Sequence, residues 1–281
     1  SDFACIRSNW QDKAQNMREI AEELNLDLSS FVYFDDNPAE RFLISHELPE
    51  VLTVDVPDDC SEFTRCLLDL DVFETLHITD EDKQRTKLYQ NERERKRLKS
   101  QITDLNSYLN ELNITVEIFV WDEFAIPRIA QLTQRTNQFN LTTRRYSESD
   151  INLLAHSESS LIYYIKSGDR FGEHGIVATC IIHIKDDSWE IDTFLLSCRV
   201  IGRGIEQAFL HFICQNAIKK NIKKIIGKFL PTQKNTIAES FYPNMGFKIQ
   251  SSNKQKTVLS LDLSSKLVSL PMHINKIKHG L

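Results

Sequence analysis

The sequence predicts an α/β segment followed by a larger α+β segment. An apolar run at residues 31–34 ends in the carboxylates Asp35 and Asp36, as strands of α/β units often do at a ligand site. Residues 88–112 are polar, helix-favouring and poor in glycine and proline, and strand and helix patterns resume at residue 114. We therefore expect the α/β part at residues 1–85, a helical linker at residues 86–113, the α+β domain at residues 114–265, and a tail at residues 266–281.

In the first segment, a helix pattern at residues 13–24 precedes the predicted strand. Carboxylates at the end of such a strand suit Mg²⁺, which prefers oxygen ligands and often shares phosphate oxygens with a substrate. The alternative is that Asp36, Asn37 and Pro38 form only a turn and a helix cap.

The second segment shows a longer series of elements. A strand at residues 114–120 is followed by helices at 122–135 and 149–156, and then by a meander of strands at 161–166, 175–184 and 189–196. A helix at 205–220, a strand at 224–230, a helix at 236–243 and strands at 247–250 and 257–263 complete the series. This order is typical of an α+β domain.

The turn between the third meander strand and the next helix contains Gly202 and Gly204. Free backbone N–H groups and the positive end of the helix dipole can hold a phosphate or pyrophosphate at such a helix N-terminus. Cys198 lies just before the turn, and the nearby Arg199 and Arg203 favour a thiolate there. Cys198 is therefore a candidate acyl-accepting nucleophile, the alternative being a small core residue.

His174 lies in a glycine-flanked, charged loop at residues 168–175. A base from this loop that approaches Cys198, oriented by an acid such as Asp192, would complete a nucleophile–base–orienter arrangement. The alternative is a hairpin loop with a solvated histidine.

A third cluster is the polar turn at residues 136–143. Neutral hydrogen-bonding side chains of this kind suit a polyhydroxylated acyl group, and an adjacent pair of arginines suits a phosphate. The alternative is an ordinary polar connection between helices. The candidate substrate-binding residues are Asn137, Gln138, Asn140, Thr142, Arg144 and Arg145.

Composition limits the possible functions. The 281 residues carry 34 Lys and Arg against 40 Asp and Glu, for a formal charge of -6, which disfavours general nucleic-acid binding. No apolar stretch approaches membrane-spanning length and no secretory signal pattern is present, so we expect no membrane association and a cytoplasmic location. The six cysteines lack paired metal-ligand spacing and are expected to be reduced thiols without a zinc site.

Residues 9–13, Asn16, Ile20 and residues 35–41, with residues 73–74 and 79–82 further on, resemble the C-terminal part of the haloacid dehalogenase-like (HAD-like) phosphatase domain of FkbH-like proteins. The resemblance implies that Lys13 neutralises phosphate charge and that Asp35 and Asp36 are Mg²⁺ ligands in a partial Rossmannoid domain. The nucleophilic Asp-x-Asp motif of that family precedes the lysine, so we expect this phosphatase half to be incomplete and inactive. Asp69 and Asp71 match the motif only in spelling, because they follow the metal acids and have helical neighbours.

The second segment resembles GNAT-type acyltransferases in its element order, its Arg-x-x-Gly-x-Gly turn and residues 241–247. The resemblance implies contacts with coenzyme A or phosphopantetheine from a set of residues on the turn and beyond it: Arg199, Gly202, Arg203, Gly204, Asn235 and Tyr242.

The FkbH-like resemblance extends to this half through residues 134–146, 169–175 and 194–204. It implies an enzyme that takes a glyceryl unit from a phosphoglyceryl substrate and transfers it to the phosphopantetheine thiol of an acyl carrier protein, in polyketide and related pathways. Two alternatives are an acetyl-CoA-dependent GNAT N-acetyltransferase and a non-catalytic remnant that binds a carrier protein.

Overall fold

The computed structural model describes residues 3–24, 26–74, 85–264, 268–274 and 276–280. The chain divides into two compact units, Ser1–Lys96 (unit 1) and Arg97–Leu281 (unit 2). The division falls within helix α5 (Arg85–Gln101), inside the segment that the sequence predicts to be a helical linker. Residues 79–82, part of the FkbH-like resemblance, lie outside the described residues.

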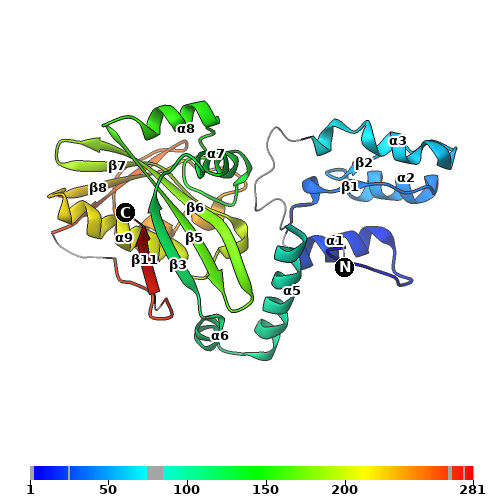
Figure 1. Ribbon diagram of the computed structural model, residues 1–281, viewed down its shortest axis with the longest axis horizontal. Coiled ribbons are helices and arrows are strands. Elements are labelled where there is room, and N and C mark those ends of the chain that lie inside the picture. Colours follow the sequence, from blue (N-terminus) through cyan, green and yellow to red (C-terminus); the bar gives the residue numbers. More distant parts are fainter. Residues whose placement is uncertain (1–2, 25, 75–84, 265–267, 275, 281) are drawn as a thin grey trace. The chain divides into compact units, whose positions relative to one another are not determined.

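Unit 1 contains a two-stranded parallel sheet and helices, drawn from blue to cyan in Figure 1. Strand β1 pairs with β2 in the register Val32↔Leu52 and Tyr33↔Thr53. The predicted helix at residues 13–24 is confirmed, and the residues before Asp69 are helical rather than extended, as expected. The elements are α1 (Lys13–Leu24), η1 (Leu28–Ser30), β1 (Val32–Tyr33), α2 (Pro38–Glu47), β2 (Leu52–Thr53), η2 (Cys60–Glu62), α3 (Phe63–Leu68) and η3 (Asp71–Phe73).

The core of unit 1 is small. It brings one face of α1, through Ala14 and Met17, against Ile44 and Leu48 at the end of α2 and against Val51. The start of α2 has the expected chemistry, because the Asn37 side chain accepts a hydrogen bond from the N–H of Ala39 and Pro38 occupies the first turn. Asn37 and Pro38 therefore form a turn and helix cap, an arrangement that is compatible with either interpretation of Asp35 and Asp36.

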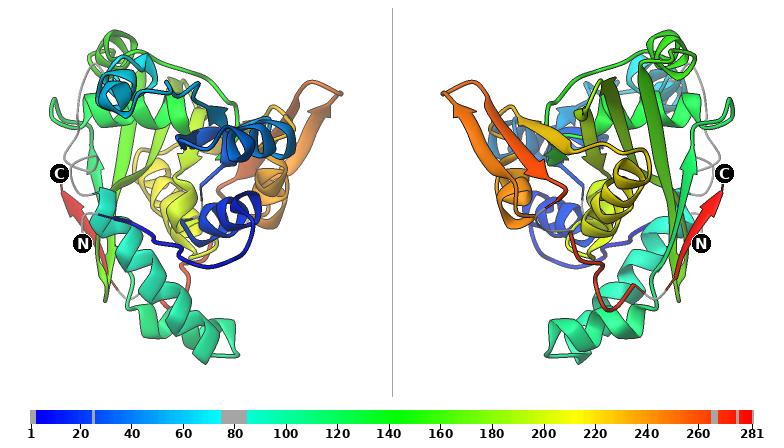
Figure 2. Two further views of the ribbon diagram at one scale, coloured as in Figure 1. Left: turned by 90° about the vertical axis from the view of Figure 1, so that its right-hand side faces the viewer. Right: turned by 90° about the vertical axis from the view of Figure 1, so that its left-hand side faces the viewer.

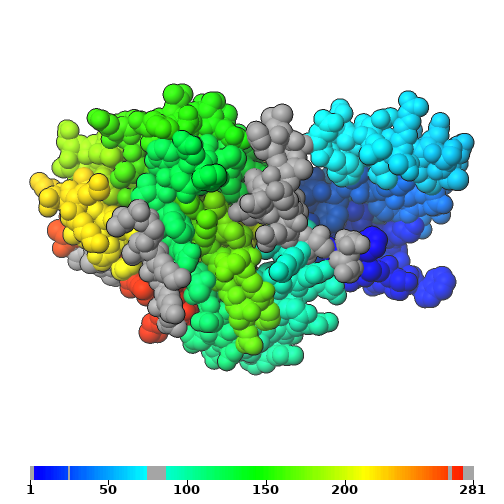
Figure 3. All heavy atoms as spheres, in the orientation of Figure 1, coloured from blue at the N-terminus to red at the C-terminus, as the bar shows by residue number. Residues whose placement is uncertain are grey.

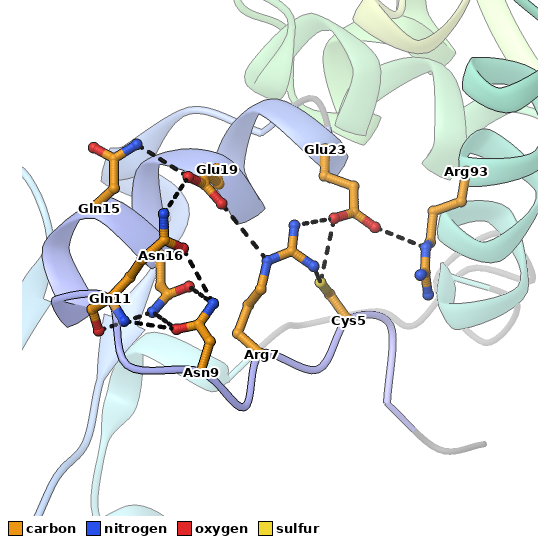
Figure 4. A network of polar contacts seen from close by, with 9 residues as sticks. All are labelled: Cys5, Arg7, Asn9, Gln11, Gln15, Asn16, Glu19, Glu23 and Arg93. Atoms are coloured by element: carbon orange, nitrogen blue, oxygen red, sulfur yellow. Dashed lines mark hydrogen bonds and ion pairs between the residues drawn. The ribbon is translucent and has the colours of Figure 1, made fainter. Parts of the chain in front are cut away.

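A polar network ties the N-terminal residues to α1 and α5 (Figure 4). The carboxylate of Glu23 on α1 bonds Arg7 and lies 2.7 Å from the Nε of Arg93 on α5. This hydrogen bond to Glu23 raises the pKa of Arg7, and burial raises the pKa of the Cys5 thiol, whose sulfur lies 3.6 Å from the Glu23 carboxylate. Glu23 thus joins three segments of unit 1 through charge-assisted bonds.

Unit 2 is built on a nine-stranded sheet with the order β11-β3-β5-β6-β7-β8-β10-β9, to which β4 adds by pairing with β7. Its strands are β3 (Thr115–Val120), β4 (Phe139–Asn140), β5 (Ser160–Asp169), β6 (Gly172–Lys185), β7 (Ser188–Leu196), β8 (Lys224–Phe229), β9 (Lys248–Ser252), β10 (Thr257–Asp262) and β11 (Lys276–Gly280). Its helices are α6 (Leu105–Leu112), α7 (Ile126–Arg135), α8 (Glu148–Ala155), α9 (Ile205–Lys219) and α10 (Phe241–Asn244), with short turns η4 (Cys198–Val200) and η5 (Thr236–Ala238). The strand and helix order predicted for residues 114–263 agrees with the structure apart from small shifts at element ends and two differences. The predicted helix at residues 236–243 is divided into η5 and α10, and the short strand β4 was not predicted.

Helices cover both faces of the central strands of this sheet (Figure 1). Phe209 and Ile213 of α9 belong to one buried cluster with Phe194 of β7, whereas Ile129 of α7 and Ile151 of α8 belong to a second cluster with the opposite face. Strand β7 is buried along almost its whole length, which explains why its sequence reads as an apolar run instead of an alternating one. The β5–β6 hairpin reaches the surface of unit 2 in Figure 3.

Strands β7 and β8 pair in parallel over only three residues each, Ser188 to Glu190 against Lys224 to Ile226. Beyond this point the segment around β4 lies between them. Leu141 N–H donates to Phe194 O of β7 at 3.1 Å, and Leu230 N–H, just after β8, donates to Leu141 O at 2.9 Å. The divergence of the two strands is thus bridged by the chain's own backbone.

Of the residues expected to form a C-terminal tail, 268–274 and 276–280 are described, and they pack onto unit 2. Strand β11 pairs in parallel with β3 and forms one edge of the sheet, and the β9–β10 hairpin lies at the other edge (Figure 2). Val268 and Ile274 are buried against the core of unit 2. In the described parts of the chain, no helix combines the length and apolar character needed to cross a membrane.

We expect Gly227→Ala to destabilise unit 2 by about 1–3 kcal/mol, because the added Cβ would lie 2.5 Å from the Tyr242 ring. Urea denaturation followed by the fluorescence of Trp189, which is buried, measures the change. Gly168→Ala is the matched control, since its Cβ meets only the end of the exposed Glu173 side chain, which can rotate away. Equal stability of both variants would contradict the close approach of β8 to Tyr242.

Candidate functional site

The glycine turn forms as predicted between the end of β7 and the start of α9. Gly202 and Gly204 both have φ of +76°, a conformation that favours glycine. A Cβ on Gly202 would meet no atom within 4 Å, whereas one on Gly204 would lie 2.9 Å from Nε2 of His273. Gly202 therefore leaves room for a ligand, and the space beside Gly204 is filled by the protein itself.

Cys198 begins η4, just after β7 ends, and is partly exposed. The neighbouring Ser197 N–H donates to Val177 O of β6 at 2.7 Å, and Arg199 Nε donates to Ser197 Oγ at 3.3 Å. The other two thiols of unit 2, Cys180 and Cys214, are buried as predicted. Cys198 is therefore the thiol of unit 2 that reaches solvent.

His174 lies in a buried charged cluster with Asp169 and Arg203. Its Nε2 is 3.2 Å from Asp169 Oδ2 and 3.4 Å from Arg203 NH1, and Arg203 NH1 is 3.3 Å from the same Asp169 oxygen. All three side chains are almost inaccessible to solvent. Arg203, predicted to contact a cofactor, is thus paired with Asp169, and His174 is not a solvated loop residue.

Asp192 does not pair with His174, contrary to the expected arrangement. The sheet register places Asp192 beside Ile181 and Ile182 of β6, so roughly 25 Å of strand separates it from His174. The acid that contacts His174 is Asp169, from the end of β5.

The buried Asp192 carboxylate is instead the centre of a second polar cluster. It lies 2.5 Å from Arg144 NH1 and 3.4 Å from His183 Nε2, and it accepts a 2.6 Å hydrogen bond from the Tyr146 hydroxyl. Burial and this hydrogen bond raise the pKa of Tyr146, and a hydrogen bond to Tyr146 together with the Asp192 charge raises the pKa of Arg144. Arg144, half exposed, is therefore paired with Asp192, and its predicted contact with a substrate stays a prediction.

Two of the predicted substrate-binding residues use their polar groups to hold the turn. Asn140 is fully buried, with its amide donating to Thr136 O and its carbonyl accepting from the N–H of Thr143. The Thr142 hydroxyl donates to Asp192 O at 2.8 Å. The structure thus assigns these two side chains to the architecture of the turn.

Arg145 also has an internal role, because its guanidinium bonds the carbonyl oxygens of Thr133 and Thr136 at the end of α7 and contacts Asn137 Oδ1. Burial lowers the pKa of Arg145. It therefore caps α7 instead of presenting a fork to phosphate. Gln138 is exposed and Asn137 partly so, and their predicted contact with substrate stays a prediction.

Asn235, predicted to contact a cofactor, is buried and links two segments of unit 2 through its side-chain hydrogen bonds. Its Nδ2 donates to Asn140 O and to Leu230 O, both at 2.9 Å, and its Oδ1 accepts from Thr232 N–H at 2.7 Å. The side chain joins the β4 segment to the residue that follows β8. All of its hydrogen-bonding capacity is used within the protein.

Tyr242 lies beside this region, on α10. Its ring is buried against Phe241 and Phe247, and its hydroxyl has no hydrogen-bond partner among the described residues. Burial raises the pKa of Tyr242 well above its ordinary value. Its hydroxyl is therefore a buried donor, packed near Gly227 of β8, that has no acceptor among the described residues.

In unit 1, Lys13 Nζ lies 2.5 Å from Asp35 Oδ2, which also accepts from the Tyr33 hydroxyl at 2.8 Å. The hydrogen bond to Asp35 raises the pKa of Lys13. Burial of Asp35 acts against its ionisation, but bonds from Lys13, the Asn37 N–H and Tyr33 hold the pKa of Asp35 below its usual value. The predicted lysine and one predicted metal acid therefore meet in space.

The magnesium assignment itself is not decided by this geometry. Asp36 is exposed, and both Asp35 oxygens already accept hydrogen bonds. Within the described ranges, no group of three or more His, Cys, Asp or Glu side chains is arranged to hold a metal ion. Mg²⁺ is often held by one or two carboxylates with phosphate oxygens and water, so the role of Asp35 and Asp36 stays a prediction.

Sequence reasoning did not single out Asp169, Tyr146, His183 or Glu206. Asp169 lies in the same charged loop as His174, which was a usable signal. His183 and Tyr146 come to Asp192 through sheet register and a loop, which no short motif encodes. Glu206 follows the glycine turn by two residues, and its Oε2 is buried without a hydrogen-bond partner among the described residues.

No protein-family model and no curated protein matches the chain. Solved structures similar to about half of it include the ribosomal-protein-S18-alanine N-acetyltransferase from Escherichia coli, with 14% identity and a TM-score of 0.43 over 53% of this chain and 94% of that one. Another is an IAA acetyltransferase from Bacillus cereus, with 17% identity and a TM-score of 0.40 over 52% and 99% of the two chains. PaiA N-acetyltransferase from Thermoplasma acidophilum in complex with coenzyme A has 14% identity and a TM-score of 0.40 over 52% and 98%. Such low scores do not establish a family for this chain.

We expect Asn235→Asp to cost about 3 kcal/mol in the free energy of unfolding of unit 2, since it replaces a donor to two buried carbonyl groups with an acceptor. Urea denaturation measures the change. Asn253→Asp is the matched control and should change stability by less than about 0.5 kcal/mol, because only its side-chain oxygen is used, in an exposed turn. An Asn235→Asp protein as stable as the wild type would contradict the stabilising role of the Asn235 hydrogen bonds.

The lowered pKa of Asp35 predicts an acid-dependent loss of stability in unit 1. A depressed folded-state pKa stabilises the fold above the unfolded value, about 3.9, and this contribution disappears as pH falls through the folded value. We expect Asp35→Asn to lower the midpoint temperature of thermal unfolding at pH 7. This midpoint should also fall less steeply than that of the wild type between about pH 4 and pH 2. Circular dichroism measures both, with the exposed Asp36→Asn as control; equal pH profiles for Asp35→Asn and wild type would contradict the ion pair.

Proposed function

We propose that unit 2 is an acyltransferase domain that accepts an acyl group from a thioester on a pantetheine arm. The observation that carries the proposal is the convergence of three features at the end of β7: a partly exposed thiol, Cys198, an open glycine at Gly202, and the divergence of β7 from β8. A thiol at a helix-leading turn next to open space suits attack on an incoming acyl group.

In this scheme the Cys198 thiolate attacks the carbonyl carbon of the thioester. A new C–S bond forms at Cys198 while the bond to the pantetheine sulfur breaks, and the pantetheine leaves as a thiolate. The reverse exchange then loads a second pantetheine thiol. No oxidant or reductant is needed, because one thioester is exchanged for another.

Two other groups support the chemistry. Tyr242 keeps its proton in the buried interior and can donate a hydrogen bond to the departing sulfur or to the carbonyl oxygen. His174 is oriented by Asp169, so its role as a base toward Cys198 uses this acid and not Asp192. The Asp192 cluster remains a separate polar patch, in which Arg144 and His183 are partly exposed.

The finer proposal is glyceryl transfer to the phosphopantetheine thiol of an acyl carrier protein. It is supported by the FkbH-like resemblance of both halves and by the Lys13–Asp35 pair, which brings together two residues to which the resemblance assigns phosphate chemistry. The glyceryl donor is then a phosphoglyceryl acyl phosphate in place of a thioester. The first C–S bond at Cys198 therefore forms as the bond from the acyl carbon to the phosphate oxygen breaks, and phosphate leaves.

The second candidate is an acetyl-CoA-dependent N-acetyltransferase. It is favoured by the unpartnered Tyr242 hydroxyl beside the diverging strands, which serves direct transfer to an amine without any protein thiol. The two candidates differ in their need for Cys198. A non-catalytic carrier-binding remnant would need neither the Cys198 thiol nor the Tyr242 hydroxyl.

We expect incubation with a glyceryl-loaded carrier protein to add one glyceryl group to wild-type protein, detected by intact-protein mass spectrometry. Cys198→Ala should lose the adduct and lower transfer at least about 1000-fold, because the nucleophile is absent. Cys60→Ala, which removes an exposed thiol of unit 1, is the control and should keep both.

The other outcomes separate the candidates. Acetyl transfer from acetyl-CoA to amines that survives Cys198→Ala and fails in Tyr242→Phe would favour the N-acetyltransferase. Binding of the carrier protein without an adduct and without turnover would favour the non-catalytic carrier-binding remnant.

A further inference from the structure

Residues 268–274 (segment 268–274) lie directly against the glycine turn that precedes α9. His273 Nε2 donates a hydrogen bond to Arg203 O at 2.8 Å. A Cβ on Gly204 would lie 2.9 Å from the same nitrogen and 3.2 Å from Pro271 Cγ, and both distances are shorter than van der Waals contact. In this chain the absence of a side chain at residue 204 therefore serves an internal contact, because any side chain there would collide with segment 268–274.

The same segment is fixed along α9 at further points. Gln207 Nε2 donates to Ser269 O at 2.8 Å, and His211 Nδ1 donates to Val268 O at 2.6 Å. Gln207 and His211 are four residues apart, so they lie on one face of the helix. Val268 and Ile274, at the two ends of the segment, are buried in the core of unit 2. Segment 268–274 is therefore a held part of the fold at the start of α9.

This packing leaves the two sides of the turn unequal. A phosphate at a helix N-terminus binds through the backbone N–H groups of the first turn, but segment 268–274 occupies the space on the Gly204 side. Arg203 is paired with the buried Asp169, and breaking that pair would leave a buried carboxylate without its partner. A Cβ on Gly202, by contrast, would meet no atom within 4 Å, so this side leaves room for a neutral pantetheine arm.

We propose that segment 268–274 is a specificity-determining segment that closes the N-terminus of α9 to a pyrophosphate group, with His273 and Pro271 as the residues that fill the space. The exclusion is steric, since it comes from side chains already in contact with the turn. Resting on the proposed acyl-transfer function, this assigns to the site a preference for pantetheine carriers without a pyrophosphate over free coenzyme A.

The test compares pantetheine and coenzyme A by isothermal titration calorimetry with the full chain. The wild type should bind coenzyme A no more tightly than pantetheine. His273→Ala removes the imidazole beside Gly204 and should tighten coenzyme A binding about tenfold or more, while pantetheine stays within about twofold. Gln207→Ala releases the segment from α9 without changing the side chains at the turn and should give a smaller gain in the same direction. A misfolded variant would lose binding, so misfolding does not explain a gain.

Met272→Ala is the matched control, because Met272 belongs to the same segment and its side chain is 96% exposed. It should leave both affinities unchanged. Inorganic pyrophosphate is a third probe, expected to bind His273→Ala and not the wild type.

Three outcomes overturn the proposal and can be told apart. If pantetheine binds while neither His273→Ala nor Gln207→Ala gains affinity for coenzyme A, segment 268–274 is not the excluding element and the proposed function stands. If His273→Ala weakens coenzyme A binding, the imidazole is a phosphate ligand instead of an obstacle. If neither pantetheine nor coenzyme A binds the wild type or any variant, the pantetheine site itself is wrong, and the inference fails with it.

Discussion

In unit 2, strands β7 and β8 separate, and hydrogen bonds from the β4 segment and Asn235 bridge the gap between them. Parallel pairing of these strands ends after Glu190, and each unpaired backbone group beyond that point needs a partner because the region is buried. The β4 segment supplies these partners through Leu141, and Asn235 ties it to the end of β8. The close packing of Tyr242 against Gly227 completes the closure from the side of α10.

This closure explains why several conspicuous polar residues are not available to a ligand. The side-chain amides of Asn140 and Asn235 are buried, and their hydrogen bonds offset the free-energy cost of burying a polar group. The same reasoning applies to Arg203 beside Asp169, since a buried guanidinium is stable only when paired. Among the described residues of unit 2, the Tyr242 hydroxyl and Glu206 Oε2 are buried without a hydrogen-bond partner. The Cys198 thiol differs from them in being partly exposed.

Unit 1 combines a small apolar core with several ion pairs. The core joins α1 and α2 to Leu48, Val51 and residues 28–33, and ion pairs of Glu23 and Asp35 add further links. Asp35 accepts three hydrogen bonds, including one from Lys13, so the pair expected from the FkbH-like resemblance also has a structural use. A structural ion pair and a phosphate-binding pair are compatible at one place, because the Lys13 side chain remains partly exposed.

The sequence by itself determined the order of the elements, because helix and strand periodicity, the Asn37–Pro38 cap and the glycine turn are local signals that need no distant partner. The position of the glycine turn between a strand and a helix, with Cys198 before it, is a local signal of the same kind. Which charged side chains pair could not be predicted from the sequence: Asp192 pairs with Arg144 and His183, and His174 with Asp169. Strand register and loop packing set those pairs, and neither is written in the spacing of residues along the chain, since one bulge or one added strand moves a side chain to a different neighbour.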